Sequence, residues 1–131
     1  MSPVAEIICV GTELLLGDIL NTNAQFLAQE LAQLGISHYY QSVVGDNPER
    51  IQRVVQTACD RANLLIFTGG LGPTPDDLTH ETLATCFGVP LVEHPEIWDD
   101  ITRKFAQRGR TLTPNNRKQA LLPQGAQVLH N

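Results

Sequence analysis

Cysteine, basic residues and long hydrophobic runs are all scarce in this sequence, and each scarcity excludes a class of protein. The cysteines are Cys9, Cys59 and Cys86, and they form no Cys-x-x-Cys pair. Neither a disulfide framework nor a zinc site is therefore indicated, and we interpret the three as small, reduced core residues. No apolar stretch approaches a membrane span, and Glu6 interrupts the first apolar run, which no basic residue precedes. We therefore expect a cytoplasmic protein with neither signal peptide nor membrane contact.

Basic residues number nine against fourteen acidic ones, which gives a formal net charge of -5. They form no cluster that could offset nucleic-acid phosphates, so we expect no nucleic-acid partner. An acidic protein that binds a phosphorylated ligand through carboxylates also needs a cation between the two.

With 131 residues, 42% of them hydrophobic, the chain is predicted to form one domain over 1–131 with its own core.

Apolar periodicity predicts that strands and helices alternate along the chain. Strands are predicted over 4–10, 36–44, 64–67 and 89–92, the last a short edge strand because of Pro90, and another strand begins at 126–129. Helices are predicted over 23–34, from Pro48, from 78 to Gly88, from Pro95 to Gly109 and through 114–122. Such alternation implies a parallel sheet covered on both faces. Because the last predicted strand has only begun where the chain stops, we expect a domain truncated at its C-terminal end.

The most distinctive stretch is residues 68–79, Thr-Gly-Gly-Leu-Gly-Pro-Thr-Pro-Asp-Asp-Leu-Thr, which follow the apolar strand over 64–67. Three glycines in four residues allow a sharp turn and let backbone N–H groups approach a bound group closely. Two aspartates, Asp76 and Asp77, then precede a helix start. This order of features is typical of loops that hold an anion, usually through a metal ion. The stretch is neither a Walker loop nor a dinucleotide fingerprint, because it lacks the residues that complete either motif.

Each of the three predicted parallel strands is followed by glycine and then a carboxylate, which is Glu13, Asp46 or Asp77. The carboxyl ends of parallel strands meet at one rim of a sheet, so we expect these side chains to lie together. Carboxylates gathered without a basic partner repel one another unless they are protonated or bind a metal. The simplest solution is a divalent ion such as Mg²⁺, shared with phosphate oxygens of the ligand.

Every one of these residues also has a simpler explanation. Asp46 or Asn47, and likewise Asp77, would fit the position of a helix cap. Asp76 would fit an ordinary turn, and Glu13 a solvated charge. The glycines could serve only to turn the chain, and no histidine shows ligand spacing. The repetition on three successive loops is what favours the functional interpretation.

The same residues carry a family resemblance. Residues 11–17, 21–23, 45–47, 68–79 and 115–122 resemble the N-terminal domain of the CinA family, the competence/damage-inducible proteins. That domain is similar to the molybdopterin-binding domains of molybdenum-cofactor biosynthesis. The resemblance covers essentially the whole chain and implies a three-layer α/β/α fold with a mostly parallel sheet. It also implies a homo-oligomer, and a C-terminal amidase domain in the full-length relatives.

The resemblance further implies an activity, the metal-dependent hydrolysis of the pyrophosphate of ADP-ribose. Asp46, Asp77 and Glu13 match acidic positions of the family and are the predicted catalytic residues. Asp46, Asp76 and Asp77 are predicted to hold a divalent metal ion, with Mg²⁺ the expected one. Whether Glu13 or Asp76 activates the water stays open. The predicted substrate-binding residues are Gly11, Thr12, Asn23, Thr68, Gly69, Gly70, Gly72 and Thr74.

Two other functions remain compatible with the sequence. One is a module that binds a pterin or nucleotide, with or without pterin adenylyltransferase activity of the molybdenum-cofactor type. The other is a non-catalytic domain that assembles or regulates a larger protein. The hydrolase and the pterin- or nucleotide-binding module both take a phosphorylated small molecule as ligand, and only the non-catalytic domain does without one.

Overall fold

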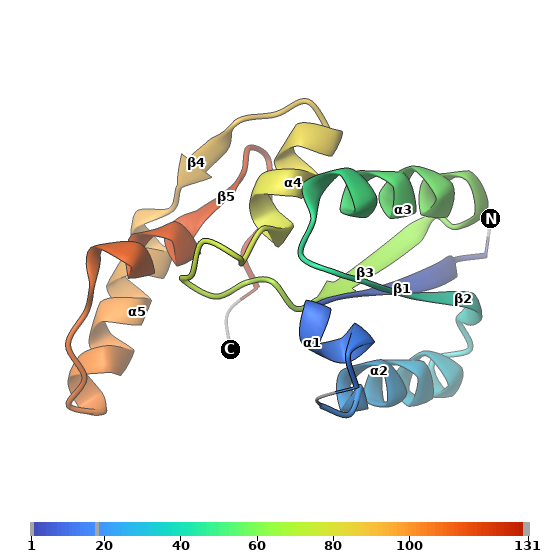
Figure 1. The fold of residues 1–131 in the computed structure, drawn as a ribbon, viewed down its shortest axis with the longest axis horizontal. Helices are drawn as coiled ribbons and strands as arrows, with labels where there is room; N and C mark the ends of the chain where they lie inside the picture. Colours follow the sequence, from blue (N-terminus) through green and yellow to red (C-terminus); the bar gives the residue numbers. More distant parts are fainter. Residues whose placement is uncertain (1, 18, 130–131) are drawn as a thin grey trace. The chain divides into compact units, whose positions relative to one another are not determined.

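The computed structural model describes residues 2–17 and 19–129 and divides into two compact units, Met1–Gly70 and Leu71–Asn131 (Figure 1). Each unit has its own helices and strands. Among the described residues, no helix combines the length and the apolar character needed to cross a membrane. The predicted extent of a single domain over 1–131 stays a prediction.

The first unit is a parallel sheet that lies between helices. Its strands are β1 (Val4–Val10), β2 (Ser37–Val44) and β3 (Leu64–Thr68), in the spatial order β2-β1-β3. The helices are α1 (Thr12–Leu15), α2 (Thr22–Gln33) and α3 (Pro48–Arg61). In Figure 1, α3 lies on one side of the strands and α2 on the other. This arrangement confirms the predicted α/β fold with a parallel sheet, and only the short α1 was not predicted.

The central strand β1 is buried on both faces, which its nearly continuous apolar sequence explains. Every residue from Ala5 to Val10 has at most 1% of its surface exposed. One face packs against α2 in a cluster that includes Ala5, Ile7, Cys9, Ala24 and Leu31. The buried residues of α3 are Ile51, Val55 and Ala58, which recur at helical spacing. Both helices are thus held by their apolar stripes.

Glu6 is the charged exception in β1, and it is fully buried. Its carboxylate accepts two bonds from Arg61 at the end of α3, with Nε to Oε1 at 2.8 Å and Nη2 to Oε2 at 3.1 Å. The guanidinium carbon of Arg61 lies 3.6 Å from the ring centroid of Tyr40 on β2. The hydroxyl of Ser42, also on β2, donates to Oε2 at 3.4 Å. The buried charge is therefore compensated by groups from α3 and β2.

The second unit contains α4 (Thr79–Cys86), β4 (Leu91–Glu93), α5 (Pro95–Gln107), the 3₁₀ helix η1 (Pro114–Ala120) and β5 (Leu121–Pro123). Strands β4 and β5 form an antiparallel pair in which Val92 faces Leu122. At the start of η1, the Thr113 hydroxyl and N–H both donate to Oδ1 of Asn116, at 3.0 and 2.9 Å. The predicted edge strand begins only after Pro90, which has no N–H to donate to a ladder.

Some of the predictions for this unit and for the cysteines are wrong. Residues 126–129 form no strand, and residues 121–122 belong to a strand rather than to the end of a helix. The reason is tertiary, because β5 forms its ladder with β4, and the N–H of Gln124 extends the pairing by donating to the Pro90 carbonyl at 2.8 Å. The three cysteines are thiols rather than disulfides, but Cys59 is exposed and Cys86 is only partly buried, so of the three only Cys9 is a fully buried core residue.

Candidate functional site

The loops that follow β1 and β2 are bonded to each other at the carboxyl edge of the sheet. The Gly11 N–H donates to the Val44 carbonyl at 2.9 Å, which extends the strand pairing by one residue. Beyond it, the Thr12 N–H donates to Oδ2 of Asp46 at 3.3 Å, and the Asp46 N–H donates to the Thr12 hydroxyl at 3.1 Å. Thr12, predicted to bind substrate, is thus the residue that orients Asp46.

Asp46 is not the cap of the helix that follows it. That role belongs to Asn47, whose Oδ1 accepts from the Arg50 N–H at 3.0 Å at the start of α3. Helix capping therefore accounts for Asn47 and leaves the carboxylate of Asp46 to Thr12 and to any ligand. The simpler explanation of Asp46 as a cap is wrong.

Glu13 lies in the first turn of α1, and its carboxylate folds over Gly11. A Cβ placed on Gly11 would lie 2.5 Å from Oε1 of Glu13, closer than such atoms can approach. Glycine at position 11 therefore leaves room for the Glu13 carboxylate beside the end of β1. Glu13 and Asp46 follow parallel strands of one sheet, as the sequence predicts, and the structure shows that these two strands are neighbours.

The end of β3 is joined to α2 and passes very close to β1. Asn23 Nδ2 donates to the Thr68 hydroxyl at 3.1 Å, while Asn21 caps α2 by accepting from the Ala24 N–H at 3.4 Å. Gly69 has φ of +89°, and a Cβ on it would collide with the carbonyl oxygen of Val10. Only glycine fits this turn.

These segments of the first unit enclose a pocket of about 170 Å³. Four predicted site residues line it, Glu13, Asn23, Thr68 and Gly69, and the predicted Gly11, Thr12 and Asp46 lie just beyond the ends of β1 and β2. The described residues that line it also include Val10, Leu14, Ile19, Leu20, Asn21 and Thr22, and none of these ten is basic. The pocket therefore combines an amide- and carboxylate-bearing side with an apolar side. Its apolar residues were missed, because Leu14, Ile19 and Leu20 look like ordinary core residues in the sequence.

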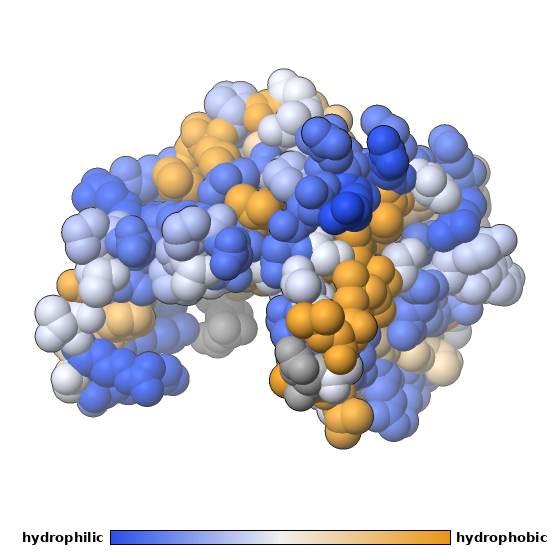
Figure 2. Space-filling view, in the orientation of Figure 1, coloured by the Kyte–Doolittle hydropathy of each residue, from blue (hydrophilic) through white to orange (hydrophobic). Residues whose placement is uncertain are grey.

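An apolar surface borders this pocket. Leu15, Leu16, Ile19 and Leu20 are all more than half exposed, and Leu20 reaches 84%. Figure 2 shows apolar side chains gathered over α1 and the start of α2, the part of the first unit that carries these residues. A ligand with a planar or apolar portion would cover some of this surface.

In the second unit, the loop that carries Asp77 is closed by Thr74. The Thr74 N–H and hydroxyl both donate to Oδ2 of Asp77, at 3.0 and 2.7 Å, and the Asp77 N–H donates back to the Thr74 carbonyl at 3.0 Å. Helix α4 begins after Leu78 and has no side-chain cap. The explanation of Asp77 as a helix cap is therefore wrong.

The same loop keeps Asp77 ionised. Its partial burial opposes ionisation, but hydrogen bonds from Thr74 and from the Gly72 amide, with the charge of Lys118, outweigh that effect and hold its pKa below the usual 3.8. Gly72 and Thr74, predicted to bind substrate, thus both bind Asp77. A carboxylate with a lowered pKa is a good cation ligand and a poor proton acceptor.

The predicted acidic residues are divided between the two units. Glu13 and Asp46 follow neighbouring strands of the first unit, whereas Asp76 and Asp77 belong to the second. Gly70, also predicted to bind substrate, is the last residue of the first unit and has φ of +67°. Among residues 2–17 and 19–129, no group of three or more His, Cys, Asp or Glu side chains forms a ready-made metal site. A meeting of Glu13, Asp46 and Asp77 stays a prediction.

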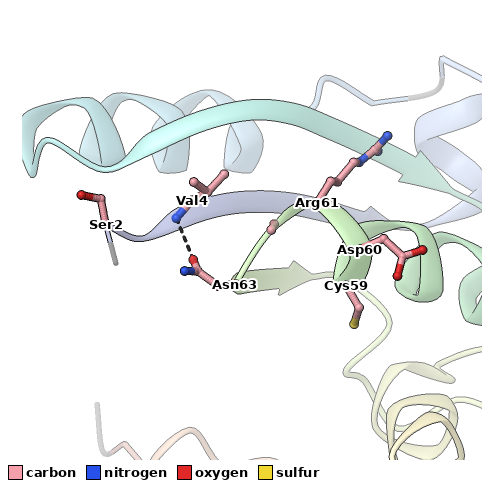
Figure 3. Close-up of a pocket in the computed structure, with 7 residues that line it drawn as sticks. Ser2, Val4, Cys59, Asp60, Arg61 and Asn63 are labelled. Carbon is pink, nitrogen blue, oxygen red and sulfur yellow. Dashed lines mark hydrogen bonds between the residues drawn. The ribbon is translucent and has the colours of Figure 1, made fainter.

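Another hollow, of about 270 Å³, lies at the amino-terminal edge of the same sheet (Figure 3). The side chains of Asn63 and Arg61, which line it, are engaged within the fold. The Val4 N–H donates to Oδ1 of Asn63 at 2.7 Å, and Figure 3 shows the side chain of Arg61, which is bonded to Glu6, directed away from that of Cys59. These bonds stabilise the ends of the strands, and we find no set of reactive side chains directed into this hollow among those described.

The environment of His80 on α4 predicts that the stability of the second unit depends on pH. Burial, aided by the charge of Lys118, lowers its pKa below the usual 6.5, although a hydrogen bond with the backbone of Leu121 opposes this shift. As the pH falls through 6.5, the unfolded chain binds the proton before the folded chain does, so stability is lost from there down to the folded pKa. We expect the midpoint temperature of thermal unfolding to decrease when the pH is lowered below 6.5, and to decrease less in the His80→Gln variant. Parallel pH profiles of the two proteins in thermal unfolding would contradict this.

Comparison with known proteins identifies the family. Residues 6–129 match the family described as "Probable molybdopterin binding domain". The chain belongs to this family. Within this molybdopterin-binding family it is of the CinA type, as the sequence predicts. It is 75% identical to the CinA-like protein of Cyanothece sp. (strain PCC 7425) and 76% identical to that of Trichormus variabilis, over 100% and 97% of its length.

The chain spans 31% and 30% of the lengths of these two relatives. Among solved structures, the protein CinA of unknown function from Thermoplasma acidophilum shares 33% sequence identity with this molybdopterin-binding domain at a TM-score of 0.85, over 99% of this chain and 76% of that one. The molybdopterin biosynthesis enzyme MoaB from Thermus thermophilus shares 21% identity at a TM-score of 0.61, over 91% and 70%. The latter similarity concerns the fold alone.

Proposed function

We propose that this CinA-type domain binds a small molecule with a pyrophosphate group and hydrolyses it with a divalent metal ion. ADP-ribose is the substrate that the family resemblance implies. The observation that carries the proposal is the pair of bonds between Thr12 and Asp46, 3.3 and 3.1 Å long, next to the pocket of the first unit. The Asp46 carboxylate does not cap the helix that follows; it accepts from the Thr12 N–H, while the Thr12 hydroxyl accepts from the Asp46 N–H, and this fixed position suits a ligand group.

The chemistry of the donors suits Mg²⁺. The bond from Thr12 falls on Oδ2 of Asp46, and both bonds from Thr74 fall on Oδ2 of Asp77, so Oδ1 of each carboxylate takes none of these bonds. Mg²⁺ usually takes one or two carboxylates together with phosphate oxygens of the substrate, rather than an all-protein cage. The described residues that line the pocket include no Lys or Arg, so a bound cation is what would neutralise a pyrophosphate there.

When bound, Mg²⁺ would neutralise charge on the phosphate oxygens and ease deprotonation of a coordinated water. The side chains of this chain supply the remaining functions. Thr12 orients Asp46, and Thr74 keeps Asp77 ionised. Glu13 lines the pocket and is the carboxylate we assign to the attacking water, with Asp76 the alternative. Asn23 and Thr68 would bind the polar groups of the substrate. Leu14 and Leu20, which line the pocket, would contact its planar ring.

A second function is favoured by the family match itself. The same pocket would hold a pterin, with the nucleotide chemistry of a transferase instead of a hydrolase. The two functions differ in what is consumed. With Mg²⁺ and water, ADP-ribose is cleaved to AMP and ribose phosphate if the first is right. If the second is right, ATP and molybdopterin give an adenylylated pterin and release pyrophosphate.

The decisive variant is Asp46→Asn, which keeps the size of the side chain and removes its charge. We expect it to lower kcat/KM for ADP-ribose at fixed Mg²⁺ by about 100-fold or more. The neutral amide would hold Mg²⁺ less well, and the positive charge of the metal would then no longer stabilise the transition state. The matched control is Asp60→Asn, an exposed aspartate on α3 outside the pocket. Equal activity of Asp46→Asn and wild type would remove Asp46 from the mechanism. If the intact domain binds neither ligand in calorimetry, the non-catalytic alternative is favoured.

A further inference from the structure

The chain has two lysines, Lys104 and Lys118, and the second unit uses them differently. Lys104 is 45% exposed and pairs with Asp100 one turn away on α5. The side chain of Lys118, on η1, is 23% exposed, and its Nζ donates to the Thr74 carbonyl at 2.6 Å, 44 residues earlier in the chain. The same ammonium lies 3.4 Å from the carboxylate of Glu81 on α4. Lys118 therefore joins three segments of the unit.

Thr74 is the residue through which Lys118 reaches Asp77. The Thr74 carbonyl accepts from both Lys118 and the Asp77 N–H, while its own N–H and hydroxyl donate to Oδ2 of Asp77. The neighbouring residues, Pro73 and Pro75, have no N–H with which to form further backbone bonds. Few interactions besides those of Thr74 can therefore fix this loop.

We propose that Lys118 is a positioning residue for Asp77, which it places by holding the Thr74 carbonyl so that Oδ1 of Asp77 is presented to a divalent cation. The inference rests on the proposed function, because that function makes Asp77 a metal ligand. Lys118 does not touch the cation or the substrate in this scheme. Its position is set in turn by Glu81 and by the Thr113–Asn116 capping interaction at the start of η1.

An anion site is the other use that the surroundings of Lys118 suggest, and the contacts argue against it. Lys118 and Arg117 both line a groove of about 580 Å³ in the second unit. The guanidinium of Arg117 is bonded to Glu93 at 2.8 Å and stacks 5.5 Å from the ring centroid of Trp98. The ammonium of Lys118 is engaged by Thr74 and Glu81. Both positive charges are thus committed within the unit.

The test compares Lys118→Met, Lys118→Arg and the matched control Lys104→Met, all in the 131-residue chain. One measurement is the affinity for Mn²⁺, read by calorimetry and by water-proton relaxation. The other is amide hydrogen exchange of Thr74 and Asp77, read by NMR. We expect Lys118→Met to weaken Mn²⁺ binding by about 10-fold, the effect usual for groups that orient a metal ligand, and to speed exchange at both amides. Lys118→Arg should keep most of the wild-type Mn²⁺ affinity and amide protection. Lys104→Met should change neither the Mn²⁺ affinity nor the exchange rates.

Unchanged exchange at Thr74 and Asp77 in Lys118→Met would overturn the inference, as would unchanged Mn²⁺ affinity. So would faster exchange spread evenly over α4, for example at the Thr82 amide, because that indicates general loosening of the unit. If the wild-type chain binds no Mn²⁺, the proposed function loses its metal, and the exchange measurement alone then decides whether Lys118 positions the loop. Should Lys118→Met fail to fold, Lys118→Gln is measured in its place.

Discussion

Replacing Gly69 with alanine is expected to destabilise the first unit by more than about 3 kcal/mol. Two effects add at this position. The backbone has φ of +89°, which side chains rarely adopt, and the new methyl group would collide with the Val10 carbonyl oxygen of the central strand. The collision is with backbone, so no side-chain rotation relieves it. Urea denaturation followed by circular dichroism measures the loss.

The control for this prediction is Gly35→Ala, which separates backbone strain from collision. Gly35 has φ of +72°, and a Cβ on it would meet nothing within 4 Å. We expect it to cost about 1 kcal/mol, the penalty of the left-handed conformation alone. Equal losses in the two variants would show that the close approach of Gly69 to β1 is unimportant. A clearly larger loss in Gly69→Ala than in Gly35→Ala would confirm that the turn at the pocket requires glycine.

Arg61→Met is expected to lower the thermal midpoint by about 10 °C or more, because it leaves the fully buried Glu6 carboxylate without its counter-charge. The remaining partner of Glu6 that the structure identifies is the Ser42 hydroxyl at 3.4 Å, too weak to replace two short bonds from a guanidinium. The stacking on Tyr40 is lost as well. Scanning calorimetry of the intact chain measures the change.

A second substitution distinguishes buried charge from lost packing. Adding Glu6→Gln to Arg61→Met removes the buried charge and should recover part of the midpoint, whereas lost packing would not be recovered. Arg53→Met, at an exposed position on the same helix, is the matched control and should shift the midpoint by about 2 °C or less. If Arg53→Met and Arg61→Met behave alike, the Glu6–Arg61 pair contributes nothing beyond an ordinary surface contact.

The alternation of secondary structure was readable from the sequence, because burial imposes its period directly on the residues. Strand β1 lies where the apolar run predicts it, and α3 begins at the predicted Pro48. The predictions of secondary structure that are wrong concern segments whose conformation depends on pairing with a segment remote in the sequence. Residues 121–123 form a strand because β4 is available to pair with them, and residues 126–129 form none.

For the candidate site, residue types were predictable and their partners were not. The glycine–carboxylate repetition pointed to Glu13, Asp46 and Asp77, and the structure places the first two after neighbouring strands. Sequence reasoning left Asp46 and Asn47 as equivalent caps, and only the hydrogen bonds separate them. Lys118 was missed altogether, because nothing local marks a lysine whose bond partner lies 44 residues away.

By itself, the sequence determined the α/β class and the chemical character of the loops, since these follow from periodicity, from glycine and from the kinds of side chain present. Its motifs also carried the resemblance to the family. Only the tertiary structure decided which groups hold the carboxylates, namely Thr12 for Asp46, and Thr74 with Lys118 for Asp77. Hydrogen bonds depend on distances of a few tenths of an ångström between atoms remote in the chain, and no local pattern encodes such distances.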